Sequence, residues 1–163
     1  MKKVRSLAWL TASMAAFLGV VMVLYTTPVL AALPLGNGGQ DMVQGAERMV
    51  KGEQMLAGPL QKQELMKSES IRTSFDQLKK GEKMVTEGKT LFMKPDTRVQ
   101  GKEMMYKGST EMMQAKDAIM QELGKDQALK TGKLASAWSD LVQGEYEMME
   151  GKNLMLRGWR LFE

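Results

Sequence analysis

The segment VQGKEMMYKG at residues 99–108 is repeated as VQGEYEMMEG at residues 142–151. Two further segments, VQGAERMVKG at 43–52 and GEKMVTEG at 81–88, share the same plan of two glycines seven residues apart with a methionine between them. Seven residues make about two turns of an α-helix, so both glycines of a segment lie on the same helix face. The repeat predicts one helical element that is used four times.

The sequence around these segments is typical of helices. It is rich in Lys, Glu, Gln, Met and Leu, and it has no alternating run of β-branched residues. Stop signals occur at Gly58-Pro59, at Lys94-Pro95-Asp96 and at Gly124-Lys125-Asp126. Lys67–Ser70 is a softer polar break. We therefore expect four helices, at about residues 41–57, 61–93, 97–123 and 127–161, with an interruption of the second near Ser68 as an alternative.

The spacing of the glycines indicates how these helices would face one another. When two consecutive helices run in opposite directions, residues that face each other are equally far from the turn between them. Gly81 and Gly108 are equally far from Lys94–Pro95, and so are Gly88 and Gly101. By the same rule the third and fourth segments would face each other about residue 126, and the first and second about residues 66–67.

These relations predict an all-α fold, an antiparallel up-down-up-down four-helix bundle with its glycines in two layers. One layer would contain Gly45, Gly88, Gly101 and Gly151, and the other would contain Gly52, Gly81, Gly108 and Gly144. At 1.5 Å of rise per residue, the two layers would lie about 10 Å apart.

An N-terminal leader precedes the predicted bundle. Lys2, Lys3 and Arg5 form a basic start, Leu7–Tyr25 is an apolar run, and small or apolar residues follow up to Ala31. This is the pattern of a secretory signal peptide. We expect a signal peptide at 1–31, a flexible tail at 32–40 and the bundle at 41–163, with the cleaved protein periplasmic or secreted. The alternative is a chain anchored by an uncleaved N-terminal helix.

Composition excludes several classes of function. The chain has no His and no Cys, which removes thiolate zinc sites, disulfides, Ser-His triads and imidazole metal sites. Without the three basic residues of the leader, 20 of the 23 basic residues remain against 19 acidic ones. That balance leaves no basic footprint for nucleic acid. We expect a protein that is not an enzyme.

The eight repeat glycines need a compensating interaction. A glycine inside a helix costs about 1 kcal/mol relative to alanine. Eight of them approach the whole stability of a typical domain, about 5–15 kcal/mol. Close helix packing with methionine side chains as filler is the favoured interpretation. The other interpretation is a ligand lodged between the helices.

The methionines suggest what such a ligand would be. Each of the four helices is expected to place a methionine between the two glycine layers, and thioethers suit soft Cu(I) and Ag(I) ions or an axial position on haem iron. No two methionines beyond the leader are three or four residues apart, so a site would have to join different helices. Its candidate ligands are Met49, Met84, Met104, Met105, Met148 and Met149.

The sequence therefore favours an exported, non-enzymatic helical module with a binding, structural or interaction role. A soft-metal or haem site in the methionine cluster is the first alternative. A membrane-anchored or membrane-surface protein is the second, with contact through an uncleaved leader or through Trp159–Phe162. A protein partner or self-association fits the favoured interpretation.

Overall fold

The computed structural model describes residues 35–62, 65–66, 68–131 and 134–162. These residues form four long helices and two short 3-10 helices. In chain order they are α2 (Asn37–Lys62), α3 (Glu69–Phe92), η1 (Pro95–Thr97), α4 (Arg98–Leu123), η2 (Gln127–Lys130) and α5 (Ala135–Arg160). No strand occurs among the described residues, as the sequence predicts. The expected signal peptide and its cleavage site lie outside the described residues.

The turns between the helices have local causes. Ser68 caps α3 by accepting a hydrogen bond from the Ile71 N–H at 3.1 Å. Pro95 opens η1, where its missing N–H has no helical partner to lose. The Thr97 hydroxyl donates to the Leu91 carbonyl at 2.8 Å and ties the end of α3 to the start of α4. Asp126 accepts from the Ala128 N–H at 2.9 Å and begins η2.

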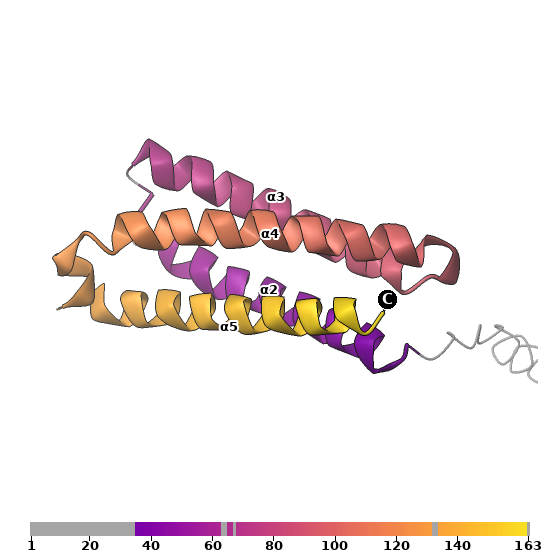
Figure 1. Ribbon diagram of the computed structural model, residues 1–163. Coiled ribbons are helices and arrows are strands. Elements are labelled where there is room, and N and C mark those ends of the chain that lie inside the picture. Colours follow the sequence, from indigo (N-terminus) through magenta and orange to yellow (C-terminus); the bar gives the residue numbers. More distant parts are fainter. Residues whose placement is uncertain (1–34, 63–64, 67, 132–133, 163) are drawn as a thin grey trace, which may run out of the picture. The chain divides into compact units, whose positions relative to one another are not determined.

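The four helices share one apolar core, an arrangement compatible with a helical bundle. Within it, α3 packs most closely on α4 and α2 packs most closely on α5, while contacts between these two pairs are sparser. Figure 1 shows both neighbourhoods. The largest fully buried side chains come from all four helices and from η2: Met42, Met49, Leu56, Leu60, Leu78, Phe92, Met105, Met112, Ile119, Leu129, Leu141 and Met148.

Three helix boundaries at the N-terminal side of the bundle differ from those expected. α3 begins at Glu69 and not near residue 61, because α2 extends to Lys62 and Ser68 caps α3. α2 begins at Asn37, within the expected tail, because Gly38 packs directly on the backbone at Gly158. The same helix continues past Gly58 to Lys62 with Pro59 inside it. Proline removes a single backbone donor, and here that loss falls in the last turn of the helix.

The link between α4 and α5 is longer than expected, and it changes which residues face each other. α5 begins at Ala135 instead of residue 127, because η2 occupies part of the connection. Lys116 contacts Glu145, and Lys152 contacts Ser109. These pairs are equally far from residues 130–131 and not from residue 126. The expected pairing of the third segment with the fourth is therefore displaced by about nine residues along the helix.

Candidate functional site

The glycines of α3 and α4 lie against each other's backbone. A methyl group added at Gly81 would lie 2.8 Å from the Gly108 carbonyl oxygen, and one added at Gly88 would lie 2.9 Å from the Gly101 carbonyl oxygen. Real methyl groups do not approach that closely. These are the two pairs expected about the Lys94–Pro95 turn, and the structure brings both together.

α2 and α5 repeat this contact although they are far apart in the chain. A methyl group at Gly45 would lie 2.5 Å from the Gly151 carbonyl oxygen, and one at Gly52 would lie 2.6 Å from the Gly144 carbonyl oxygen. The sequence placed these pairs at common levels. It also expected glycine contacts between α2 and α3 and between α4 and α5, but the nearest neighbours of each paired glycine belong to a single partner helix.

A fifth glycine pair, the third between α2 and α5, was not predicted from the sequence. Gly38 on α2 lies against the carbonyl oxygen and neighbouring atoms of α5 around Gly158. The signal was present, since both residues continue the seven-residue spacing of Gly45 and Gly151. The Gly38–Gly158 pair was not predicted because residues 32–40 were expected to form a flexible tail.

Methionines fill the space beside most of these glycines. The rule is regular: the residue four positions after a glycine lies on the glycine of the partner helix. Met49 Cγ would be 2.8 Å from a methyl group at Gly151, and Met148 Cγ would be 2.6 Å from one at Gly52. Because that space is occupied by side chains of the partner helix, the glycines are explained by packing.

The predicted metal ligands are divided by this geometry. Three of them, Met49, Met105 and Met148, have no exposed surface. Met84 and Met104 are half-buried. Met149 is 44% exposed and lies on the outside of α5. Met49 and Met148 share the α2–α5 interface, while Met105 lies on Gly88 in the other helix pair.

Buried charges join the two helix pairs, and periodicity did not predict them. Glu53 on α2 is fully buried, and Lys79 Nζ on α3 lies 2.9 Å from its Oε1 in an ion pair. Neither carboxylate oxygen has a hydrogen bond of good geometry. Burial raises the pKa of Glu53, and the nearby Lys79 amine offsets only part of this rise. This group destabilises the fold when it is ionised.

Lys152 on α5 occupies a niche on α4. Its amine donates to Ser109 Oγ at 2.7 Å and to Thr110 Oγ1 at 2.9 Å, and it lies 4.2 Å from the centre of the Tyr106 ring. Both hydroxyls donate in turn to the Tyr106 carbonyl oxygen. Burial lowers the pKa of Lys152 to about 8.

About two turns after Ser109 on α4, at the same interface with α5, Lys116 makes a conventional ion pair. It is 4% exposed, and its amine lies 3.0 Å from Glu145 Oε1. Burial acts to lower the pKa of Lys116, but hydrogen bonds to Asp117 and Glu145 outweigh it and raise the pKa. Lys116 is therefore held charged, whereas Lys152 is held only by neutral groups in the described part of the chain.

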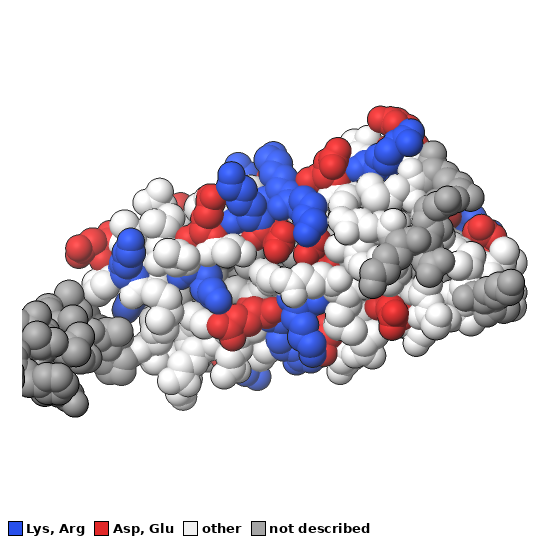
Figure 2. Space-filling view, turned by 180° about the vertical axis from the view of Figure 1, so that it is seen from behind, with Lys and Arg blue, Asp and Glu red and all other residues white. Residues whose placement is uncertain are grey.

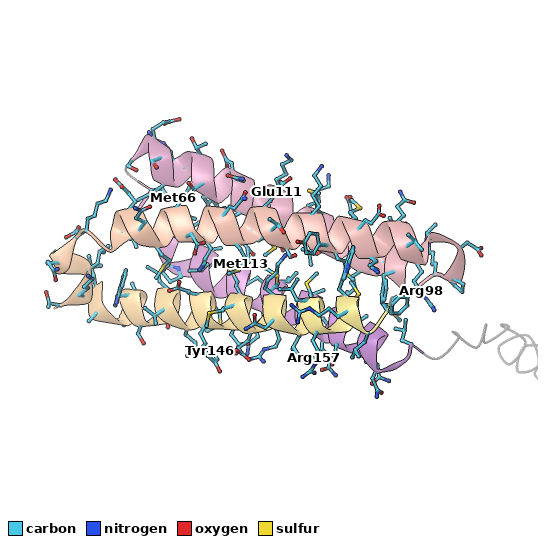
Figure 3. The ribbon with its side chains drawn as sticks, viewed as in Figure 1. Met66, Arg98, Glu111, Met113, Tyr146 and Arg157 are labelled. Carbon is cyan, nitrogen blue, oxygen red and sulfur yellow. The ribbon has the colours of Figure 1, made fainter. Side chains whose placement is uncertain are left out.

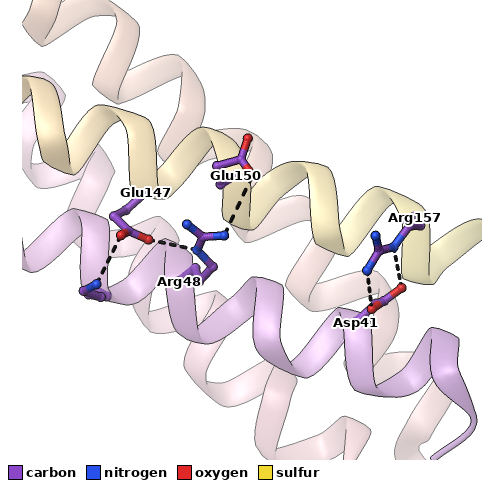
Figure 4. A network of polar contacts seen from close by, with 6 residues as sticks. Asp41, Arg48, Glu147, Glu150 and Arg157 are labelled. Carbon is purple, nitrogen blue, oxygen red and sulfur yellow. Dashed lines mark hydrogen bonds and ion pairs between the residues drawn. The ribbon is translucent and has the colours of Figure 1, made fainter.

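Ion pairs also bridge α2 and α5 (Figure 4). Arg48 Nε donates to Glu147 Oε2 at 2.8 Å, and Lys51 Nζ donates to Glu147 Oε1 at 3.1 Å. These hydrogen bonds lower the pKa of Glu147. Nearer the end of α5, Arg157 makes a two-pronged contact with Asp41, each bond 2.7 Å long. They fix the register of two helices that no turn connects.

The described residues contain no group of three or more carboxylates placed to hold a metal ion. Among the same residues, no helix combines the length and hydropathy that crossing a bilayer requires. No protein-family model, curated protein or solved structure matches this chain.

Proposed function

We propose that this chain is an exported, non-enzymatic binding or interaction module. Its folded part would be an antiparallel up-down-up-down bundle that follows a cleaved signal peptide. One observation carries the proposal: the space beside each paired glycine is filled by backbone and side-chain atoms of the partner helix. The glycine–methionine repeat then serves packing, and binding falls to the outer surface.

The opposite directions of the paired helices support the bundle topology. Gly81 contacts Gly108 and Gly88 contacts Gly101, so residue numbers fall along one helix as they rise along its partner. The α2–α5 pair follows the same order at Gly45 with Gly151 and at Gly52 with Gly144. Export is supported by the leader sequence alone, and N-terminal sequencing of the protein from its native host tests it. We expect Ala32 as the first residue.

Replacing buried methionine by leucine tests the packing role. The quadruple variant Met49→Leu, Met84→Leu, Met105→Leu and Met148→Leu keeps the side-chain volume nearly constant, and such exchanges usually cost less than about 1.5 kcal/mol each. We expect a cooperatively folded helical protein by circular dichroism. Met149→Leu, at an exposed position, is the matched control. Loss of the fold in the quadruple variant together with loss of a stoichiometric ligand would contradict the proposal.

A soft-metal site is the second candidate, favoured by the complete burial of Met49, Met105 and Met148. Thioethers held away from water are suited to Cu(I) and Ag(I). Anaerobic titration of the wild type and of the quadruple leucine variant with Ag(I) separates the two functions. Packing alone predicts the same weak binding in both. A haem site is less favoured, because methionine side chains already occupy the space beside the glycines.

A further inference from the structure

Four chain segments meet at one end of the helical unit. The start of α2 lies beside the end of α5, since Gly38 adjoins Leu161. The end of α3 joins them, because the Phe92 and Phe162 rings are 5.3 Å apart. η1 and the start of α4 complete this end, which is at the right of Figure 1, and Figure 3 labels Arg98 there. We call it the η1 end.

The η1 end exposes large apolar side chains. Met93 is 43% exposed, Val99 is 69% exposed and Leu161 is 62% exposed. They come from three different segments, so they form a feature of the end itself and not of one helix. A shallow hollow of about 420 Å³ lies between Gly36–Gly39 and the pair Leu161 and Phe162.

Cations surround these apolar groups. Lys94 and Arg160 are exposed, and no carboxylate pairs with either in the described part of the chain. Lys102 extends over aromatic rings, with its amine 4.0 Å from the Trp159 ring centre and 5.9 Å from that of Phe162. Asp96 is the acidic residue of η1. The described residues of this end therefore carry more basic than acidic side chains, beside exposed apolar ones.

The opposite end of the unit, around η2, differs in its charges. Lys125 lies 2.6 Å from Glu122, and Arg72 lies 2.9 Å from Glu69. The Lys130 amine donates to the Gly124 carbonyl oxygen at 2.8 Å. On the long faces, basic and acidic side chains are interspersed, as Figure 2 shows for one of them. Among the described residues, Lys130 at the η2 end also has no carboxylate partner, but no large apolar side chain is exposed beside it. In the described part of the chain, the η1 end is thus where such cations lie beside exposed apolar side chains.

The preceding chain enters the unit at this same end. The apolar run of the sequence stops at Tyr25, and α2 starts at Asn37. A fully extended segment of that length reaches at most about 40 Å. If the run lies in a bilayer, before cleavage or as an anchor, this link joins it covalently to the η1 end.

We propose that the η1 end rests on an anionic lipid bilayer, with Met93, Val99 and Leu161 at the interface and Lys94, Lys102 and Arg160 among the headgroups. The combination suits an interfacial site, since apolar side chains gain by leaving water while basic side chains are attracted by anionic lipids. The Lys102 amine lies over the Trp159 and Phe162 rings, so its charge is held at this end of the unit. This inference rests on the proposed function, for which it names the partner.

Single cysteines test the proposal in the full chain, which has none of its own. Val99→Cys and Leu161→Cys report on the η1 end, and Gln127→Cys in η2 is the matched position at the other end. Each is labelled with an environment-sensitive fluorophore, and the chain is placed in nanodiscs of phosphatidylcholine with or without phosphatidylglycerol. Nitroxide-labelled lipids then quench any label that touches the bilayer.

We expect severalfold stronger quenching at positions 99 and 161 in anionic discs than in neutral ones, and little at 127 in either. High salt should weaken it, because the attraction is screened. Lys94→Glu with Arg160→Glu should reduce quenching at position 99 to the neutral-disc level, while Lys125→Glu with Lys130→Glu should not.

Equal quenching at 99 and 127, or no dependence on lipid charge, would overturn the proposal. Circular dichroism of each variant shows whether the fold is kept. Suppose that the labels show no such quenching, while the quadruple leucine variant folds and binds no Ag(I). The proposed function as a binding or interaction module is then retained, but its partner is not a membrane.

Discussion

The two helix pairs pack through the same glycine contacts, but their helices are separated by very different lengths of chain. α3 and α4 are neighbours joined by η1, and the turn sets which residues face each other. α2 and α5 are the first and last helices described, and the hydrogen-bonded pairs between them are 96 to 116 residues apart. Both pairs place glycine on glycine. Only the remote pair adds a row of close interhelical ion pairs.

This difference indicates how register is specified when no turn can do it. A helix that slides by one turn along a glycine–methionine face finds another small or flexible group opposite. Charges at Asp41, Arg48 and Glu147 oppose such a slip, because each has its partner at a single register. In the α3–α4 pair the interhelical ion pair of Lys80 with Glu111 is longer, at 3.5 Å. There the Pro95 turn performs that role.

Overpacking a glycine layer should produce the largest effect. In Gly151→Leu the new side chain would meet the backbone at Gly45 and at Met49, so we expect a loss of about 3 kcal/mol, measured by urea denaturation. Gly101→Leu should cost a similar amount in the other pair. Hydrogen exchange distinguishes them: α2 and α5 should lose protection in the first variant while α3 and α4 retain more of theirs.

If both variants lost hydrogen-exchange protection equally in all four helices, the two helix pairs would not be separate packing units. Val142→Leu, on the exposed side of α5, is the control for a larger side chain at an open position. It should change stability by no more than about 0.5 kcal/mol.

Between the pairs, the niche of Lys152 should give the next largest effect. Burial lowers the pKa of Lys152 to about 8 from an ordinary value of 10.5, so the folded state binds this proton less tightly than the unfolded state. Stability should therefore rise as the pH increases from about 8 to about 10.5. Lys152→Met should remove this rise and stabilise the protein at pH 7. We expect about 1–2 kcal/mol, less than the full pKa shift implies, because solvent screens the half-buried amine.

The hydroxyls of Ser109 and Thr110 keep their acceptor in this variant, because both already donate to the Tyr106 carbonyl oxygen. Lys83→Met, at a position whose side chain is 76% exposed, is the matched control and should leave the pH dependence unchanged. A wild-type protein that loses stability over the same pH range would contradict the assignment.

The ion pairs of the remote helices should have a smaller effect. Hydrogen bonds from Arg48 and Lys51 lower the pKa of Glu147, so its contribution is present above the ordinary value of 4.5 and lost as the pH falls through the lowered value. Glu147→Gln should cost about 1 kcal/mol at pH 7, since both cations are partly solvated. Glu111→Gln is the counterpart in the α3–α4 pair, and a larger loss there would argue against the role given to these charges.

The sequence predicted the glycine contacts best where it contains a clear turn signal. Pro95 is such a signal, and the glycine pairs of α3 and α4 follow from its position. The α4–α5 register was wrong because Gly124-Lys125-Asp126 gives only the first stop, while η2 lengthens the connection without a further break signal. The start of α2 was concealed because Gly38 and Gly39 are typical of loops, and their helical state depends on packing against α5.

The charged groups were beyond a periodicity argument for a different reason. Glu47 and Lys51 are spaced like a solvated pair on one helix, four residues apart. In the structure Glu47 binds Lys89 on α3, and Lys51 binds Glu147 on α5. Sequence spacing shows which side chains share a helix face, but the partner across an interface depends on the register between helices. The niche of Lys152 could not be foreseen for the same reason.

The smallest effect comes from the glycine of α2 that has no partner. A methyl group at Gly58 would meet nothing within 4 Å outside its immediate neighbours. Alanine there gains about 1 kcal/mol of helix propensity, but the following Pro59 disfavours the helical conformation of any residue with a Cβ. We expect these effects to offset each other, so that Gly58→Ala changes the free energy of unfolding by less than about 0.5 kcal/mol. Gly52, six residues earlier on the same helix, is its counterpart, since a methyl group there would lie 2.6 Å from the Gly144 carbonyl oxygen. Gly52→Ala should lose about 1–2 kcal/mol despite the same gain in propensity, because two backbones must move apart. Urea denaturation of the two variants side by side separates the effect of the interhelical glycine contact from that of helix propensity. Equal stabilities would mean that the glycine layers are not held by close packing.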